Sequence, residues 1–340
     1  MNEKRAYNIF KLFKGRGLFG KFGIILVLAA LVVFFSLSSE SFLTVSNIMT
    51  VSRQVSMIGV CSIGMMFVIL TGGIDLSVGS TMSFVNVLCA YFMVKLGMNP
   101  VLAIILCIII SAGAGYTSGL FITKLGVPSF ISTLAFMNIL SGIAFIISHG
   151  MPIFGYPASF NVIGQGYVGP IPVPVIIMIV VMALGAFILR KTYFGRYFYA
   201  IGGNEEAAKL SGINVALTKQ MVYMLSSVFA AIAGIIMLSR LSSGVATTGS
   251  GFEFQVITAV ILGGVSISGG AGNVFGVAVG VLIMGVLSNG LILINMNEYV
   301  QRVVQGVVLL GAVSIDCVSK RKGKINLKDR KKEIRTEAKV

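Results

Sequence analysis

The sequence predicts an all-α, polytopic integral membrane protein with about ten transmembrane helices and both termini in the cytosol. Three observations predict this fold class. Of the 340 residues, 56% are hydrophobic and only 11% are charged, apolar segments recur along the chain, and basic residues cluster outside them. Soluble domains contain roughly 25% charged residues, so this chain lacks the ionic groups that a water-facing surface requires. A spanning helix needs about 20 apolar residues, which allows eight to ten spans here.

Apolar segments define the order of elements along the chain, with boundaries uncertain by a few residues. The segment 253–264 is too short to span a bilayer, which favours a half-helix or a re-entrant piece. The chain divides into a basic N-terminal tail (1–21), a transmembrane domain (22–317) and a basic C-terminal tail (318–340). The predicted segments are 22–38, 54–71, 79–97, 100–121, 129–148, 173–190, 219–240, 253–264, 272–294 and 299–317.

The net charge of +15 orients these segments. Residues 1–21 contain six basic residues against one acid, residues 317–340 contain ten against three, and residues 190–219 add five. Basic clusters of this kind are typical of the cytosolic side of a membrane protein, so both tails and the loop 191–218 are predicted to be cytosolic. We expect the tails to contact anionic lipid. No basic groove lined by aromatic residues accompanies them, which argues against a nucleic-acid partner.

Residues 15–21 have the G-x4-G-K spacing of a phosphate-binding loop, but the sequence does not support a nucleotide site. Phe22 stands where such a loop needs Ser or Thr to hold Mg²⁺, and no strand precedes the motif. Cys61, Cys89 and Cys107 lie inside apolar segments without metal-ligand spacing. We therefore predict no catalytic residue, no metal site and no cofactor in this chain.

Two adjacent glycines, Gly72 and Gly73, interrupt the chain after the second apolar segment, and Asp75 and Ser77 follow them. An Asp can cap the next helix by accepting backbone N–H bonds. An ionised Asp at the centre of a bilayer costs about 2.5–3.5 kcal/mol, so it needs a partner, a water-filled cavity or a helix end. Two interpretations remain open and compatible. Asp75 is a helix cap at the cytosolic membrane edge, or it belongs to the wall or gate of a translocation path.

A weak internal similarity relates residues 70–77 to residues 261–268, which contain Gly263 and Gly264. Transporters often contain structural repeats with broken helices at the repeat interface. We therefore include Gly263 and Gly264 with Gly72 and Gly73 among the candidate residues of the translocation path or gate.

The loop 191–218 contains a short helix with favourable ends. Asn204 is a good N-cap residue, Glu205 and Glu206 follow where acids stabilise the helix dipole, and Gly212 can end the helix. Such a helix is either a tight connector or a docking element for a soluble partner. Its small apolar surface would fit a groove, and the residues concerned are Ala207, Ala208 and Leu210.

Small residues recur every four positions in two of the apolar segments, as Gly272, Gly276 and Gly280 and again as Ser111, Gly115 and Gly119. Such spacing lets helices approach closely in lipid. We expect these faces to pack inside one subunit, with a subunit interface as the alternative.

These motifs, in their order and spacing, resemble the membrane permease of bacterial ABC importers for ribose and related simple sugars. The matching stretches are residues 68–80, 195–214, 240–243, 251–253 and 262–272, and only the basic tails lie outside the resemblance. The resemblance implies a multi-pass protein of the bacterial cytoplasmic (inner) membrane. It also implies a second permease subunit, identical or related, that completes the pore.

The resemblance further implies cytosolic ATPase subunits that bind ATP and Mg²⁺ and an extracytoplasmic sugar-binding protein that delivers the solute. The ATPase subunits would dock on the loop that contains Gly203, Asn204, Glu205, Glu206, Ala207, Ala208 and Gly212. Gln255 and Asn273 stand where ribose permeases usually have an acid and a base, and permeases for xylose, galactose and autoinducer-2 look similar. The alternatives are an ion-coupled secondary transporter, for which Asp75 is the candidate deep acid, and a passive channel for a small polar solute.

Overall fold

The computed structural model describes the backbone of residues 19–337 and the side chains of residues 23–318, and this part of the chain is a helical bundle. Each of the ten predicted apolar segments falls on one helix. The elements are α2 (Phe19–Ser38), α3 (Val45–Leu70), α4 (Val78–Val94), α5 (Pro100–Lys124), α6 (Ser129–Ser148), η1 (Ala158–Asn161), α7 (Val162–Gln165), β1 (Tyr167–Val168), β2 (Ile171–Pro172), α8 (Val173–Lys191), α9 (Tyr193–Gly203), α10 (Glu205–Leu210), α11 (Val215–Leu241), α12 (Phe252–Leu262), α13 (Val274–Leu293) and α14 (Glu298–Glu337).

Within the described residues, seven helices are long and apolar enough to cross a membrane: α3, α5, α6, α8, α11, α13 and the apolar part of α14. Three shorter apolar helices accompany them, namely the Gly23–Ser38 part of α2, α4 and α12. The 11 residues of α12 extend only about 17 Å, roughly half the thickness of the hydrocarbon core. The expectation that this segment is too short to span a bilayer is therefore confirmed, and whether it is a half-helix or a re-entrant piece stays a prediction.

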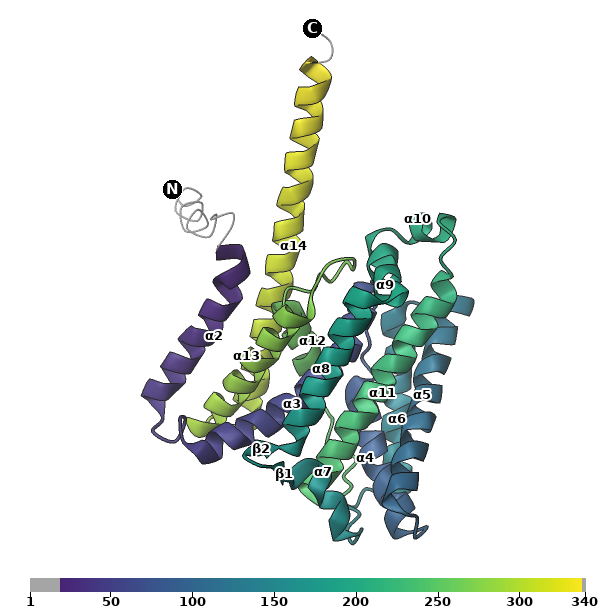
Figure 1. Ribbon diagram of the computed structural model, residues 1–340, viewed down its shortest axis with the longest axis vertical. Helices are drawn as coiled ribbons and strands as arrows, with labels where there is room; N and C mark the ends of the chain where they lie inside the picture. Colours follow the sequence, from purple (N-terminus) through teal and green to yellow (C-terminus); the bar gives the residue numbers. More distant parts are fainter. Residues whose placement is uncertain (1–18, 338–340) are drawn as a thin grey trace.

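The two ends of the described chain lie at the same end of the bundle. Helix α2 begins there, and α14 ends there, on the side where α9 and α10 lie, whereas α7 and the β1–β2 hairpin lie at the opposite end (Figure 1). This arrangement agrees with an even number of crossings, and the cytosolic assignment of the α9–α10 end remains a prediction from charge. Helix α14 continues through the predicted boundary at residue 318. Most of the predicted tail 1–21 lies outside the described residues.

The centre of the bundle is built on α3 and α11. Every residue of α3 from Val55 to Leu70 is buried, as expected for a helix that is apolar on all sides. Helix α11 packs against α3, α4 and α5. These two helices therefore form the packed core of the bundle, around which the shorter helices α4 and α12 are arranged.

Both stripes of small residues pack within this chain. A Cβ atom on Gly276 or Gly280 would overlap carbonyl groups at the end of α12, and one on Gly115 or Gly119 would overlap atoms of α11. The preferred expectation of packing inside one subunit is confirmed for these four residues. Gly272 precedes α13 and so is not part of the helical stripe.

Candidate functional site

The chain leaves the helix between α3 and α4, at the glycine pair that the sequence singled out. The N–H of Gly72 donates to the carbonyl of Ile69 (2.9 Å), and the N–H of Gly73 donates to that of Val68 (3.1 Å). Gly72 has φ +80°, which a residue without a Cβ adopts at little cost. This pattern of hydrogen bonds is a Schellman C-cap, and it satisfies the last carbonyls of α3.

Asp75 then lies inside the bundle, with only 1% of its surface exposed. Its Oδ1 accepts hydrogen bonds from the backbone N–H (2.9 Å) and the hydroxyl (2.6 Å) of Ser77. Its Oδ2 accepts a hydrogen bond from the hydroxyl of Ser226 (2.7 Å). Among the described residues, no basic side chain forms an ion pair with Asp75. These three hydrogen bonds therefore compensate the loss of water around the carboxylate.

The position of Ser226 shows how deep Asp75 lies. Helix α11 has 27 residues and a length of about 40 Å, and Ser226 is close to its midpoint. The segment from Gly72 to Ser77 thus enters the bundle instead of crossing its surface. The 17 residues of α4 span only about 25 Å, so the chain enters the bundle before that helix begins, and the location of Asp75 relative to the cytosolic membrane edge stays a prediction.

Asp75 is also not the N-cap of α4. Helix α4 begins at Val78, its N-cap is Ser77, and the Ser77 side chain makes no capping hydrogen bond. Its Oδ1 instead accepts the hydrogen bond from the N–H of Ser77, two residues further along the chain, as in an Asx-turn. The capping prediction is therefore corrected: Asp75 shapes the turn that precedes the helix.

The second glycine pair has the same local geometry one residue out of register. Gly264 has φ +81°, and its N–H donates to the carbonyl of Ile261 (2.8 Å). The N–H of Val265 donates to the carbonyl of Val260 (3.2 Å). Gly264 therefore corresponds to Gly72, whereas the sequence similarity had paired Gly263 with Gly72. The two turns are alike because both end a helix in a Schellman motif.

The structure brings together some, but not all, of the residues that were predicted to belong to the translocation path or gate. Gly72, Gly73, Asp75 and Ser77 form one segment that contacts α11. Gly263 lies against the start of α13, where a Cβ atom would approach the backbone of Val277 to 2.7 Å. Their common role in a translocation path stays a prediction.

Helix α9 connects the two turns. The N–H of Gly270 donates to the carbonyl of Leu70 (3.0 Å), and a Cβ atom on Gly202 would overlap that carbonyl. The hydroxyl of Tyr199 donates to the carbonyl of Gly272 (2.8 Å). Burial raises the pKa of Tyr199 above its usual value, so the phenol stays protonated as this donor. The loop that the sequence predicted as a docking element is therefore fixed to the end of α3.

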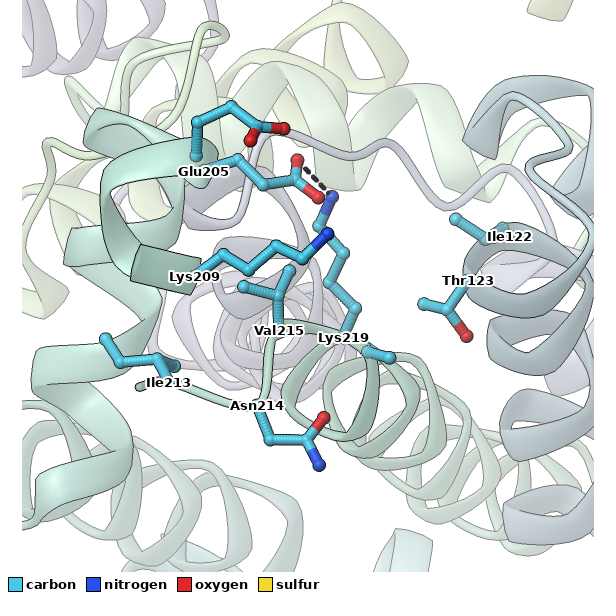
Figure 2. Close-up of a pocket in the computed structure, with 10 residues that line it drawn as sticks. Ile122, Thr123, Glu205, Lys209, Ile213, Asn214, Val215 and Lys219 are labelled. Carbon is cyan, nitrogen blue, oxygen red and sulfur yellow. Dashed lines mark hydrogen bonds and ion pairs between the residues drawn. The ribbon is translucent and has the colours of Figure 1, made fainter. Parts of the chain in front are cut away.

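Helix α10 has the ends predicted from the sequence. The side chain of Asn204 accepts from the N–H of Ala207 (3.0 Å), and Gly212 ends the turn with φ +83°. Figure 2 shows Glu205 paired with Lys219 at the start of α11, at 2.6 Å. This ion pair holds α10 beside α11.

A hollow of about 370 Å³ lies between α10, the end of α5 and the first turn of α11 (Figure 2). Leu210 on α10 is 88% exposed, and Ala207 is exposed as well. Ala208 is buried, so the predicted apolar surface consists of Ala207 and Leu210 without Ala208. The residues that line the hollow are Ile122, Thr123, Glu205, Glu206, Lys209, Ile213, Asn214, Val215, Ala216 and Lys219.

Arg53 and Arg240 both contact Gln165 at the opposite end of the bundle, Arg53 with its guanidinium and Arg240 with its backbone carbonyl. The Arg53 guanidinium lies 4.7 Å from the ring centroid of Tyr167 and donates to the carbonyl of Gln165 (3.3 Å). The side chain of Gln165 donates in turn to the carbonyl of Arg240 (3.3 Å). Neither arginine forms an ion pair in the described part of the chain.

Sequence reasoning also missed the residues of α11 that adjoin the glycine pair, namely Lys219, Tyr223 and Ser226. Single polar residues in an apolar helix are usually explained by packing. The available indication was their spacing of four and three positions, which places them on one helix face.

The sequence is similar to known proteins over most of its length. The family described as "Branched-chain amino acid transport system / permease component" matches residues 47–313. The chain is 46% identical over 302 residues to the ribose import permease protein of Bacillus subtilis (strain 168), covering 88% of this chain and 94% of that protein. It is 38% identical to the ribose import permease protein of Escherichia coli (strain K12), with 86% and 92% covered.

A xylose transport system permease protein of Haemophilus influenzae is 34% identical, with 88% of this chain and 96% of that protein covered. No solved structure matches this chain.

Proposed function

The chain belongs to this family of transport-system permease components, and we propose that it is the pore-forming subunit of a binding-protein-dependent ABC importer for a simple sugar of the ribose type. The observation that supports this most strongly is the similarity to ribose and xylose permeases over nearly their whole length. The subunit provides the path through the membrane, and ATP is hydrolysed by separate subunits.

The ATPase subunits dock on α9 and α10. These helices lie outside the long apolar helices, at the end of the bundle where α2 begins (Figure 1). Leu210 offers an exposed apolar side chain, and the hollow beside Glu205 and Glu206 can receive a side chain of the partner. A rigid, capped helix suits this role because little conformational entropy is lost on docking.

The binding protein docks on the opposite end. The Arg53 guanidinium is held there on the carbonyl of Gln165, and in the described residues neither Arg53 nor Arg240 has an acidic partner. Guanidinium groups without an acidic partner attract carboxylates of a partner protein, which would form charge-assisted hydrogen bonds with them. The binding protein therefore presents acidic side chains to this end of the permease.

A second permease subunit completes the pore. At least one of the two departures from the ribose pattern has a structural role. Asn273 is the N-cap of α13 and accepts from the N–H of Gly276 (2.8 Å), so it stabilises a helix end. Gln255 is half-buried on α12. A ribose-like sugar remains the proposed solute.

The first experiment is affinity purification of the tagged chain from its native membrane with identification of the bound proteins. Reconstituted vesicles that contain the recovered complex should then take up labelled ribose only when ATP is present. Recovery of the chain alone, together with ribose uptake that an uncoupler abolishes, would refute the proposal in favour of an ion-coupled transporter.

A charge reversal tests the docking surface. Glu206→Lys should reduce recovery of the ATPase subunit, since Glu206 lies on α10 at the proposed interface. Glu40→Lys is the matched control, because this exposed residue lies in the connection between α2 and α3 at the other end of the bundle. Equal recovery with both variants would contradict docking on α10.

A further inference from the structure

One face of α11 leads from α10 to the buried carboxylate. Lys219, Tyr223 and Ser226 are spaced at i, i+4 and i+7, so they lie along one side of the helix. The first of them forms the 2.6 Å ion pair with Glu205. The last donates the 2.7 Å hydrogen bond to Asp75. Two charged contacts are therefore joined by less than two turns of one rigid helix.

The middle residue of this face contacts the broken segment between α3 and α4. Tyr223 is 2% exposed, and a Cβ atom on Gly73 would overlap its hydroxyl oxygen. A cavity of about 230 Å³ lies beside it, and its lining includes Gly72, Gly73, Lys219 and Tyr223. The face of α11 thus adjoins the segment from Gly72 to Asp75 along its whole length.

Helix α9 makes a second connection to the same segment. Gly202 lies against the carbonyl of Leu70, which also accepts the N–H of Gly270 (3.0 Å). The end of α9 is linked to α10 through Asn204. Movement of the α9–α10 unit would therefore reach the Asp75 segment from two sides: through the end of α3 and through α11.

We propose that the Ser226–Asp75 hydrogen bond is the contact through which α11 positions the start of α4, so that docking events at α10 change the path at mid-depth. Ser226 and Lys219 are positioning residues in this scheme. The inference rests on the proposed function, because it needs an ATPase subunit on α10. Packed helices transmit displacement in this way when both ends of the connection are fixed.

The test measures ATP hydrolysed per ribose imported by the reconstituted complex of permease, ATPase and binding protein. Ser226→Ala should raise this ratio at least about tenfold, the lower end of the factor that corresponds to the loss of one hydrogen bond to a charged group. Ser226→Thr keeps the hydroxyl and should restore the ratio. A merely structural role would lower uptake and hydrolysis in parallel, and an unchanged ratio in Ser226→Ala would overturn the proposal.

Three controls keep the outcome interpretable. Ser111→Ala removes a buried hydroxyl that has no hydrogen-bond partner in the described structure, so its ratio should equal that of the wild type. If Ser226→Ala fails to assemble, Ser226→Cys keeps a weak donor and should raise the ratio several-fold, and a wild-type ratio in that variant overturns the proposal. Absence of ATP-dependent uptake by the wild-type complex refutes the proposed function itself.

A double variant tests the connection between the two contacts. Lys219→Met alone should also raise the ATP per ribose, because it removes the ion pair with Glu205. Combined with Ser226→Ala it should add little, since both changes interrupt the same connection. If the two substitutions instead raise the ATP per ribose by factors that multiply, Lys219 and Ser226 act independently, which would contradict transmission through α11.

Discussion

Helix α5 offers a sharp test of how closely the helices of this bundle approach one another. Gly113 and Gly115 lie two positions apart on it. Gly113 is exposed and has no atom within 4 Å of the place where a Cβ would stand. Gly115 is buried, and the same atom would overlap the Ser227 hydroxyl and lie 2.5 Å from the backbone carbonyl of Tyr223. The methyl group added by Gly→Ala would therefore lie in open space at Gly113 and against α11 at Gly115.

Helix propensity and overpacking change the free energy of unfolding of these variants in opposite directions. Replacing Gly by Ala inside a helix gains about 1 kcal/mol of helix propensity at either position. At Gly115 the new Cβ atom also crowds the carbonyl oxygen of Tyr223, which cannot move without α11. This overpacking lowers the free energy of unfolding by about 1–3 kcal/mol. Gly113→Ala should therefore stabilise the protein by up to about 1 kcal/mol, and the free energy of unfolding of Gly115→Ala should be about 1–3 kcal/mol lower than that of Gly113→Ala.

The assay is reversible unfolding of the two purified variants in mixed micelles, followed by helical circular dichroism and compared with the wild type. Measuring the difference between the variants removes the contribution of helix propensity, which both share. Gly115→Ala that is as stable as Gly113→Ala would refute the close packing of α5 on α11 described above.

Three further predictions follow from individual contacts. Leu210→Glu should lower recovery of the ATPase subunit at least tenfold while thermal unfolding stays unchanged, since Leu210 is exposed; a quantitative pull-down checks this, and full recovery would contradict docking there. Asn289→Ala removes two reciprocal 2.9 Å hydrogen bonds with Asn47 and should lower the free energy of unfolding by about 1–3 kcal/mol; an unchanged value would show that the pair adds nothing. Ser239→Ala removes the acceptor for the Gly164 N–H (2.7 Å), so limited proteolysis should cut near α7 sooner than in the wild type, and equal rates would contradict this anchor.

The α-helical membrane fold and the capped helix α10 were predictable because their causes are local. Apolar segments of sufficient length specify helices in lipid wherever they occur. Asn204 and Gly212 act on groups within a few residues of themselves, so the sequence alone located both ends of α10. The glycine pairs were likewise recognised as helix ends, although the correspondence between Gly72 and Gly264 needed the backbone angles.

The sequence by itself thus determined the helices, their order and the cap residues of α10. The tertiary structure decided the burial of Asp75, its hydrogen bond to Ser226, which lies 151 positions further along the chain, and the contacts of Gln165 with the Arg53 guanidinium and the Arg240 carbonyl. These contacts depend on which helices become neighbours, and that is settled by close packing over the whole bundle. Local patterns contain no information about partners so far apart, and for this reason the candidate site emerged only from the fold.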